Sequence, residues 1–401
     1  LPFSTASLPT GNPLKSCNTV YCQLKLIGID LNNFTLDKLP DITPDKALAV
    51  AAALGLAVDP LIGANLIFNA ADYKNPTAYQ GGLGVERQLG KSLSVGADFI
   101  YIHTVHLERN RDLNLPLPIL RPTTVDPAQR PFYGLRTTPE TGVCKTTATG
   151  GTAPVGSCVR PISTLGSITV RESTSKSLYR ALTLRAKFQK KWGQFNAFYT
   201  LSKNIGDDDN ERDATGFRYE NAFDTRPEYA DSNIDRRHQF VTSSVFFLPH
   251  GIDVASSFRA FSGSPVDAGS GLTDPNEDRG GPDRPYLGPG VPFRRNGFRN
   301  LAVYFVDVHG AKRFTFAENK RLVFTVDIFN LFNTQNIQLS GSAVTNLCSP
   351  TTASCGFAGV TNPNFLQLID RNPASARFGK YLLNNNPGPP FQMQFGARFQ
   401  F

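Results

Sequence analysis

Apolar and polar residues alternate along several segments of the chain, and these segments come in pairs joined by short turns. In the segment 178–189, every second side chain from Leu182 onward is apolar, and after a turn the alternation resumes and runs to residue 202. Successive side chains on a strand point to opposite faces, so a period of two predicts β-strands and the short turn predicts a hairpin. The plan recurs in three further pairs and one single segment: 81–88 with 93–103, 238–247 with 252–261, 303–316 with 321–329, and 391–401.

The connections between hairpins differ from the turns within them. They span roughly 30 to 70 residues and hold most of the proline, glycine, aspartate and cysteine, although long connections are rare in compact soluble domains. Alternation alone also fits a soluble β-sandwich. Short turns that alternate with long loops are typical of outer-membrane barrels. The sequence therefore predicts an all-β fold, an antiparallel transmembrane β-barrel with about nine to ten visible strands and long extracellular loops.

The pattern is weaker near the start of the chain. Thr43 and Pro44 favour the N-cap and first position of a helix. We expect a short helix and one or two strands there, within 47–56, 21–30 and 65–71. The expected organisation is one barrel domain over residues 1–401, with a loop and helix region at 1–74, hairpin repeats at 75–401 and no plug domain.

Composition narrows the class of protein. The chain is 40% hydrophobic and 11% aromatic, which excludes a disordered chain. It contains no apolar run of the roughly 18 residues that a membrane-spanning helix needs. The net charge of +8 indicates a basic surface, but no block of five Lys or Arg residues occurs, so nucleic acid is not an expected partner. Attraction to anionic lipid headgroups stays open.

Six cysteines fall in three local pairs within segments rich in glycine, threonine and proline. The pairs are Cys17 with Cys22, Cys144 with Cys158, and Cys348 with Cys355. Pairing of near neighbours into three disulfides is the simplest arrangement, and it predicts an oxidising compartment. Zinc binding is a weaker alternative, because no Cys-x2-Cys spacing occurs and no histidine lies near the pairs. Free buried thiols are a further alternative.

One acidic segment offers oxygen ligands for a cation. Asp274, Asn276 and Asp278 occupy alternate positions, as they do at the start of a calcium-binding loop. The EF-hand pattern then requires glycine where this chain has Arg279, and no glutamate stands at the twelfth position. Calcium is therefore one interpretation, and a solvated acidic loop is the other. The sequence by itself does not assign a metal site, and no cofactor is expected.

The chain carries no recognisable catalytic motif. It has no Gly-x-Ser-x-Gly turn, no phosphate-binding loop of the Gly-x-x-x-x-Gly-Lys type and no His-Glu-x-x-His helix. His103 and His106 would point to opposite faces of a strand, so they do not predict a metal site. We expect that the protein is not an enzyme.

The last eight residues alternate polar and aromatic side chains around a glycine. Gln394, Gly396, Phe399 and Phe401 fit the order polar, glycine, aromatic, aromatic. This segment resembles the signal that the outer-membrane assembly machinery reads on the last strand of bacterial barrels. A physical reason exists, because a last strand must pair to remove an edge, and terminal aromatics anchor it at the membrane interface. An ordinary amphipathic strand is the alternative.

Several short segments, in order, resemble the C-terminal barrel part of TonB-dependent receptors of the Oar-like class. The segments are 75–76, 83–89, 179–182, 199–203, 235–240, 283–285 and 327–333. The resemblance implies a bacterial outer-membrane barrel of about 22 strands that is filled by a plug and driven by the TonB complex. Its expected partners are outer-membrane lipid, the barrel-assembly machinery and an unknown extracellular ligand.

The chain departs from that family plan. Its strands account for about half of such a barrel, and neither a plug nor a TonB-contact segment is recognisable. We expect either a piece of a longer receptor or a reduced barrel, with TonB as a partner only where a plug is encoded upstream. Ligand binding and import is the expected function. A structural or adhesive surface barrel is the alternative, and a secreted β-rich enzyme is the third interpretation.

Overall fold

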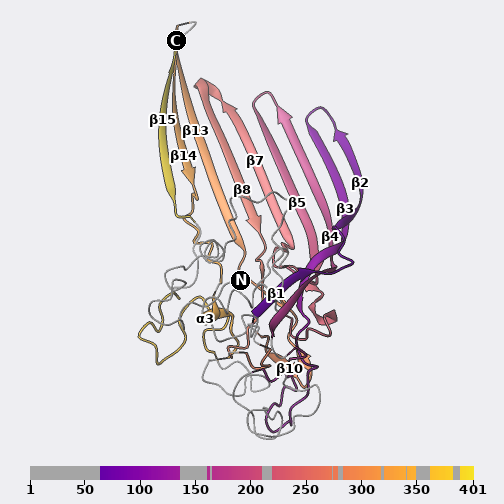
Figure 1. The fold of residues 1–401 in the computed structure, drawn as a ribbon. Coiled ribbons are helices and arrows are strands. Elements are labelled where there is room, and N and C mark those ends of the chain that lie inside the picture. The colour runs from indigo at the N-terminus through magenta and orange to yellow at the C-terminus, as the bar shows by residue number, and fades with distance from the viewer. Residues whose placement is uncertain are drawn as a thin grey trace, which may run out of the picture.

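A computed structural model shows one large antiparallel sheet with irregular segments gathered at one of its ends (Figure 1). The residues it describes are 64–135, 160–162, 165–209, 219–272, 274–278, 283–317, 320–339, 341–348, 362–382 and 389–401. The helix expected within 47–56 and the strand expected within 21–30 lie outside these residues.

Nine long strands build the sheet. They are β2 (Thr77–Leu89), β3 (Leu93–Asp112), β4 (Leu165–Lys190), β5 (Gly193–Gly206), β7 (His238–Leu248), β8 (Ile252–Phe261), β13 (Val303–Ala317), β14 (Lys320–Phe329) and β15 (Gln392–Gln400). Each pairs antiparallel with its neighbour, and the order β15-β14-β13-β8-β7-β5-β4-β3-β2 follows the chain. All nine strands expected from the alternation are thus confirmed.

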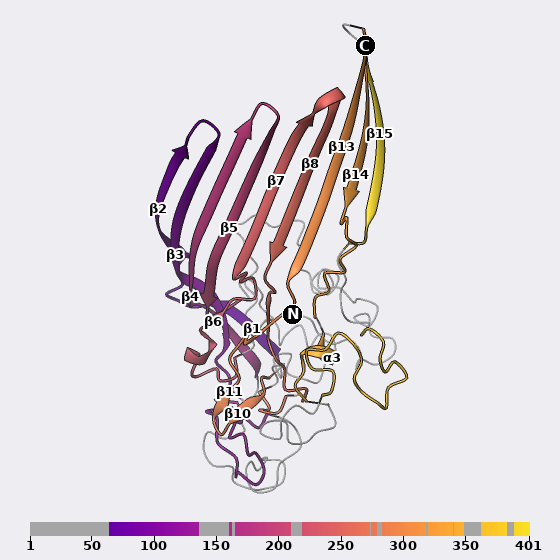
Figure 2. The same cartoon turned by 180° about the vertical axis from the view of Figure 1, so that it is seen from behind.

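Two short strands join the sheet away from this path. β1 (Ala64–Asn69), which falls in the expected segment 65–71, pairs parallel with β4, and β6 (Ala230–Asp231) pairs with β5. Within the described residues β2 and β15 do not pair with each other, so the sheet is an open, curved segment (Figure 2).

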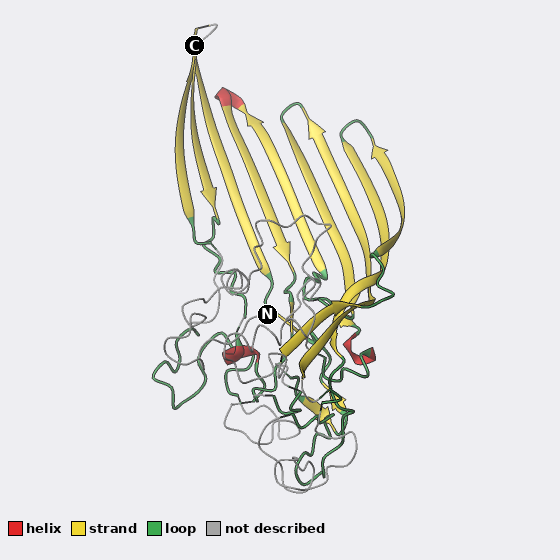
Figure 3. Cartoon of the chain, viewed as in Figure 1, coloured by secondary structure: helices red, strands yellow, loops and turns green. Residues whose placement is uncertain are grey.

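The short turns all lie at one end of the sheet and the long connections at the other (Figure 3). The connections hold η5 (Arg226–Glu228), α3 (Ser342–Thr345) and two small ribbons, β9 (Pro265–Val266) with β12 (Phe298–Arg299) and β10 (Tyr286–Gly288) with β11 (Val291–Pro292). One turn is a single helical turn, η6 (Pro249–Gly251), where His250 and Gly251 adopt φ of 62° and 72°. No helix in the described ranges is long and apolar enough to span a membrane.

β3 and β4 are longer than the alternation predicts. They run for 20 and 26 residues, whereas about 9 to 11 residues suffice for a tilted strand to cross a bilayer. The added part of β4, residues 165–177, has only three apolar residues, all before Arg171, and is polar on both faces from 171 to 177, so it carries no sustained period-two signal. It is ordered by pairing with β1 on one side and with 107–112 of β3 on the other, past a register shift near His106.

The register places apolar and polar residues on opposite faces of the sheet. On the face that we call the apolar face, one row crosses seven strands: Val85, Ala97, Leu184, Tyr199, Phe240, Ala260 and Tyr304. On the opposite face, the polar face, a second row crosses the same strands: Gln88, Ser94, Lys187, Asn196, Ser243, Ser257 and Asp307.

The apolar face is uncovered in the described structure. Leu83 is 81% exposed, Val85 66% and Phe395 73%. A soluble sandwich would bury such residues against a second sheet, whereas a barrel presents them to lipid. A contiguous exposed apolar surface of this kind therefore favours the barrel over the sandwich.

Candidate functional site

The long connections pack into a folded cap at the loop end of the sheet. Leu115, Tyr133, Leu135 and Ala222 form a buried cluster there, although Leu115 and Ala222 are more than a hundred positions apart. The Tyr133 hydroxyl accepts a hydrogen bond from the backbone of Ala222 at 3.1 Å. Burial raises the pKa of Tyr133, with nearby carboxylates adding to the shift. The cap is thus a packed structure with its own core.

One cysteine lies within the described residues. Cys348 is 1% exposed, packs against Leu347 and is not a free thiol. The other five lie outside the described residues, so the three predicted pairings, including Cys348 with Cys355, stay predictions.

Ion pairs line the polar face of the sheet. Arg185 contacts Glu86 and Asp98, each at 3.1 Å. Other pairs join neighbouring strands: Arg259 with Asp307 at 2.8 Å, Arg313 with Asp253 at 2.8 Å, and His309 with Asp327 at 2.6 Å. Such a face suits a water-filled barrel interior.

Two buried arginines form ion pairs at the strand ends and within the cap. Arg109 of β3 contacts Asp207 at 2.6 Å, with both side chains less than a tenth exposed. Arg284 pairs with the buried Glu228. Burial raises the pKa of Glu228, and the opposing effect of Arg284 is the next largest. Removing one partner of such a buried pair leaves an uncompensated charge. The Arg109–Asp207 pair therefore holds the start of the connection after β5 to β3, and the Arg284–Glu228 pair joins two connections within the cap.

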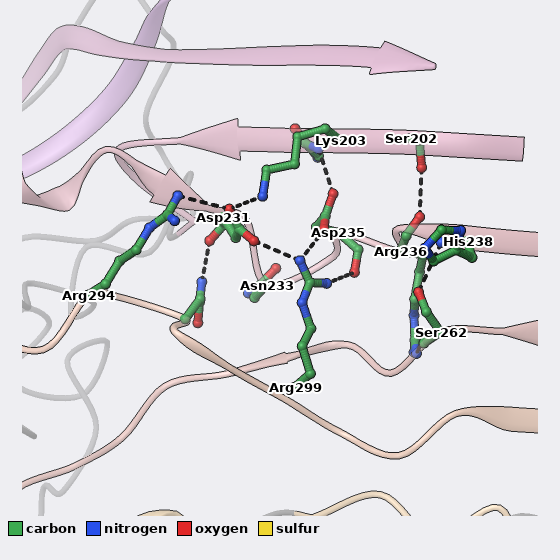
Figure 4. Close-up of polar contacts among 12 residues, drawn as sticks. Ser202, Lys203, Asp231, Asn233, Asp235, Arg236, His238, Ser262, Arg294 and Arg299 are labelled. Atoms are coloured by element: carbon green, nitrogen blue, oxygen red, sulfur yellow. Dashed lines mark hydrogen bonds and ion pairs between the residues drawn. The ribbon is translucent and has the colours of Figure 1, made fainter. Parts of the chain in front are cut away.

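Asp231 of β6 is the centre of a second charged group (Figure 4). Its carboxylate accepts contacts from Lys203 at 2.5 Å, Arg299 at 2.7 Å and Arg294 at 3.1 Å. Arg299 also contacts Asp235 at 2.6 Å. Burial favours a higher pKa for Asp231, but the three cations outweigh it and lower the pKa. The group joins β5, the connection before β7 and the connection before β13.

Carboxylates crowd a buried part of the cap. Burial raises the pKa of Asp283 to about 8, and the nearby charges of Glu220, Asp278 and Asp274 add to the shift. One side-chain oxygen of Glu220 and one of Asp283 are buried without a hydrogen-bond partner among the described residues. Unpaired buried oxygens of this kind are costly, so they indicate protonation or an added cation.

The candidate calcium ligands lie at this place. Asn276 is fully buried and donates to the Asp278 carboxylate at 3.1 Å, while the Asp278 amide donates to Asn276 at 3.2 Å. Asp274 has a φ of 50° in the turn that precedes them. Within the described ranges no three His, Cys, Asp or Glu side chains are arranged to hold a metal ion. Calcium binding by Asp274, Asn276 and Asp278 stays a prediction.

The candidate assembly signal forms an edge strand. Gln394, Gly396 and Phe399 lie opposite Asp327, Thr325 and Leu322 of β14. Phe401 is 92% exposed, and its ring stacks on Phe399 with centroids 5.9 Å apart. The strand is in place, and its role as a signal stays a prediction.

The sequence singled out neither Arg109 nor Asp231. The cap does bring together three of the segments that resembled TonB-dependent receptors, namely 199–203, 235–240 and 283–285. They supply Lys203, Asp235 and Arg284 to the two charged groups. Their similarity to a known family was the one signal that marked these positions.

An antiparallel sheet with an exposed apolar face, an ion-paired polar face and loops gathered at one end defines a transmembrane β-barrel architecture. The family model described as an outer membrane beta barrel domain matches residues 30–286. The chain therefore belongs to this family. No curated protein matches it in sequence.

Several solved structures are similar to the chain, among them two transporters and one import receptor. The outer membrane transporter YddB from Escherichia coli shares 10% identity at a TM-score of 0.42, over 84% of this chain and 34% of that one. The ferric-catecholate import receptor Fiu from E. coli shares 12% at 0.38, over 83% and 29%. The iron transporter FrpB from Neisseria meningitidis shares 10% at 0.39, over 84% and 33%. The chain spans about a third of the length of these proteins.

Proposed function

We propose that the chain forms part of an outer-membrane receptor of the TonB-dependent, Oar-like type, which binds and imports an extracellular ligand. The polar face would line the barrel interior, the short turns would face the periplasm, and the cap would face outside and capture the ligand. The ligand would pass along the polar face without covalent chemistry. TonB would act on a plug within the whole protein.

The row of ion pairs along the polar face carries this proposal. A barrel with a purely structural or adhesive role needs only its outer surface and loops, whereas an import path needs a polar, hydrated wall. Arg185 with Glu86 and Asp98 begins this wall near the turn end, and His309 with Asp327 continues it across the sheet. The family match and the ordered receptor-like segments support the same interpretation.

Uptake from a complex growth medium tests the proposal. Cells with the protein, cells without it and cells lacking TonB would share one medium, and mass spectrometry would follow its solutes. We expect at least one solute to disappear faster with the protein and only when TonB is present. If no solute differs, the structural or adhesive alternative replaces import. If one differs without need of TonB, the barrel is a passive channel.

A charge reversal on the polar face links that uptake to the structure. Arg185→Glu would place a third carboxylate beside Glu86 and Asp98 and should change the uptake rate while the protein still reaches the membrane. Lys91→Glu makes the same change of charge in an exposed hairpin turn and should leave uptake unaltered. Equal effects of both variants would contradict passage along this face.

A further inference from the structure

A basic pocket opens where the apolar rows of β5 and β7 end. It has a volume of about 380 Å³ and is lined by Lys203, Arg237, His238, Ser262, Gly263 and Arg299. At Gly263 a Cβ atom would lie 1.7 Å from the backbone oxygen of Asn300, so a larger residue would displace the backbone on this side of the pocket. Four of the six lining residues are basic, and none is acidic.

The register places three of the lining residues, Lys203, His238 and Ser262, on the side of the apolar face. His238 lies opposite Leu201, so its side chain is on the same face as those of Tyr199 and Phe240. Lys203 follows Leu201 by two positions on β5 and is on that face as well. Ser262 lies opposite His238, because their backbones exchange a hydrogen bond at 2.8 Å and the Ser262 hydroxyl accepts from the His238 amide at 3.1 Å. Residues two apart on a strand share a face.

An aromatic residue connects this pocket with the apolar surface. Tyr199 hydrogen-bonds His238 at 2.8 Å between Oη and Nδ1, and the two rings stack with centroids 6.2 Å apart. The apolar row of β5 continues from Tyr199 to Leu201 and ends before Lys203. The pocket therefore lies at the edge of the apolar band, where charged residues replace apolar ones.

Positive charge is in excess around this pocket. Lys203, Arg294 and Arg299 share the carboxylates of Asp231 and Asp235. Burial and the charge of Arg299 lower the pKa of the adjacent Arg236. Arg237 is exposed, and no carboxylate of the described residues forms an ion pair with it.

We propose that this pocket binds a phosphate group carried by a membrane lipid. Arginine presents a planar fork that matches phosphate oxygens, lysine adds a point charge, and the Ser262 hydroxyl is a further donor. An acyl chain attached to that phosphate would run along the apolar face beyond Tyr199. The proposal depends on membrane embedding and not on import.

Lipid binding by the purified protein in a zwitterionic detergent tests this proposal. Native mass spectrometry would count bound phosphatidic acid and, separately, diacylglycerol with the same acyl chains. Inorganic phosphate would be titrated in parallel by calorimetry. We expect phosphatidic acid to bind at least tenfold more tightly than either of the other two. Equal binding of diacylglycerol would overturn the role of phosphate, and equal binding of inorganic phosphate would overturn a lipid source.

Substitutions then assign the binding to this pocket. Arg237→Gln removes one exposed charge and should weaken phosphatidic acid binding about fivefold, as one cation near a lipid surface is worth about 1 kcal/mol. Arg237→Lys keeps the charge and should restore most of the binding. Arg226→Gln is the matched control, because this arginine is 90% exposed and pairs with Asp224 in the same connection. Equal binding by Arg237→Gln and the wild type would overturn the assignment.

Discussion

Leu184 lies in the middle of the apolar face, and replacing it with arginine tests which face meets the lipid. It lies opposite Ala97 on one side and Tyr199 on the other. Phe188, four residues further along β4, belongs to the apolar row nearest the turn end. At about 3.3 Å per residue, with the usual tilt, this places Leu184 about 10 Å into an apolar band that is about 25 Å tall. No charged residue occupies its row, so the new cation would meet hydrocarbon.

The expected loss for Leu184→Arg is about 3 kcal/mol, the cost of arginine near the midplane of a barrel. Thr183→Arg is the matched control, because Thr183 lies on the polar face beside Asp98. That variant would lose a 2.9 Å contact between Thr183 and Thr200, worth about 1 kcal/mol, and would gain a carboxylate neighbour. The control should therefore lose no more than about 1 kcal/mol.

Denaturant unfolding of the protein in lipid vesicles measures both losses. The fluorescence of Trp192 reports the transition, because this is the sole tryptophan of the chain and it stacks on Phe246 at the turn end. Equal losses for the two variants, or a larger loss for Thr183→Arg, would refute the assignment of the faces.

Three further outcomes are expected. Asp283 holds a proton up to about pH 8 in the folded state but releases it near its ordinary pKa of 3.8 when unfolded. Stability should therefore fall as pH rises between about 4 and 8, and Asp283→Asn should flatten this fall in melts across that range. Deleting the exposed Phe401 should lower the amount of heat-modifiable protein in outer membranes, while vesicle refolding of purified protein stays unchanged. If Cys348 pairs with Cys355, Cys348→Ser should cost about 2 kcal/mol in non-reducing buffer and nothing in reducing buffer; equal losses in both buffers would contradict that pairing.

The strand ends show where local pattern stops being informative. The alternation located the strand pair 178–189 and 195–202 within a few residues, because one face of each strand is apolar along its membrane-crossing part. It missed 165–177, where the apolar residues are few and residues 171–177 are polar on both faces. This segment is extended because its first half pairs with β1, which comes about a hundred positions earlier in the chain, and its second half with β3.

No local sequence pattern could predict the charged groups of the cap. Asp231 and Arg299 are 68 positions apart and meet at 2.7 Å. Both stand in two-residue strands within connections that carry no periodicity. The acidic segment around Asp278 was visible as a candidate ligand set, but its crowding with Asp283 against Glu220 depends on the packing of two separate connections.

Period-two alternation was enough to identify strands, hairpin order and the opposite character of the two faces, because each strand meets the same two environments along its length. The lengths of the loops and the receptor-like segments were needed in addition to predict a membrane barrel, because alternation alone also fits a soluble sandwich. Strand register, the exposure of the apolar face, the ion pairs of the polar face and the position of the basic pocket came only from the folded chain. Each of these depends on contacts between distant residues, whose distance in space is set by hydrogen bonding between strands and by packing of the cap.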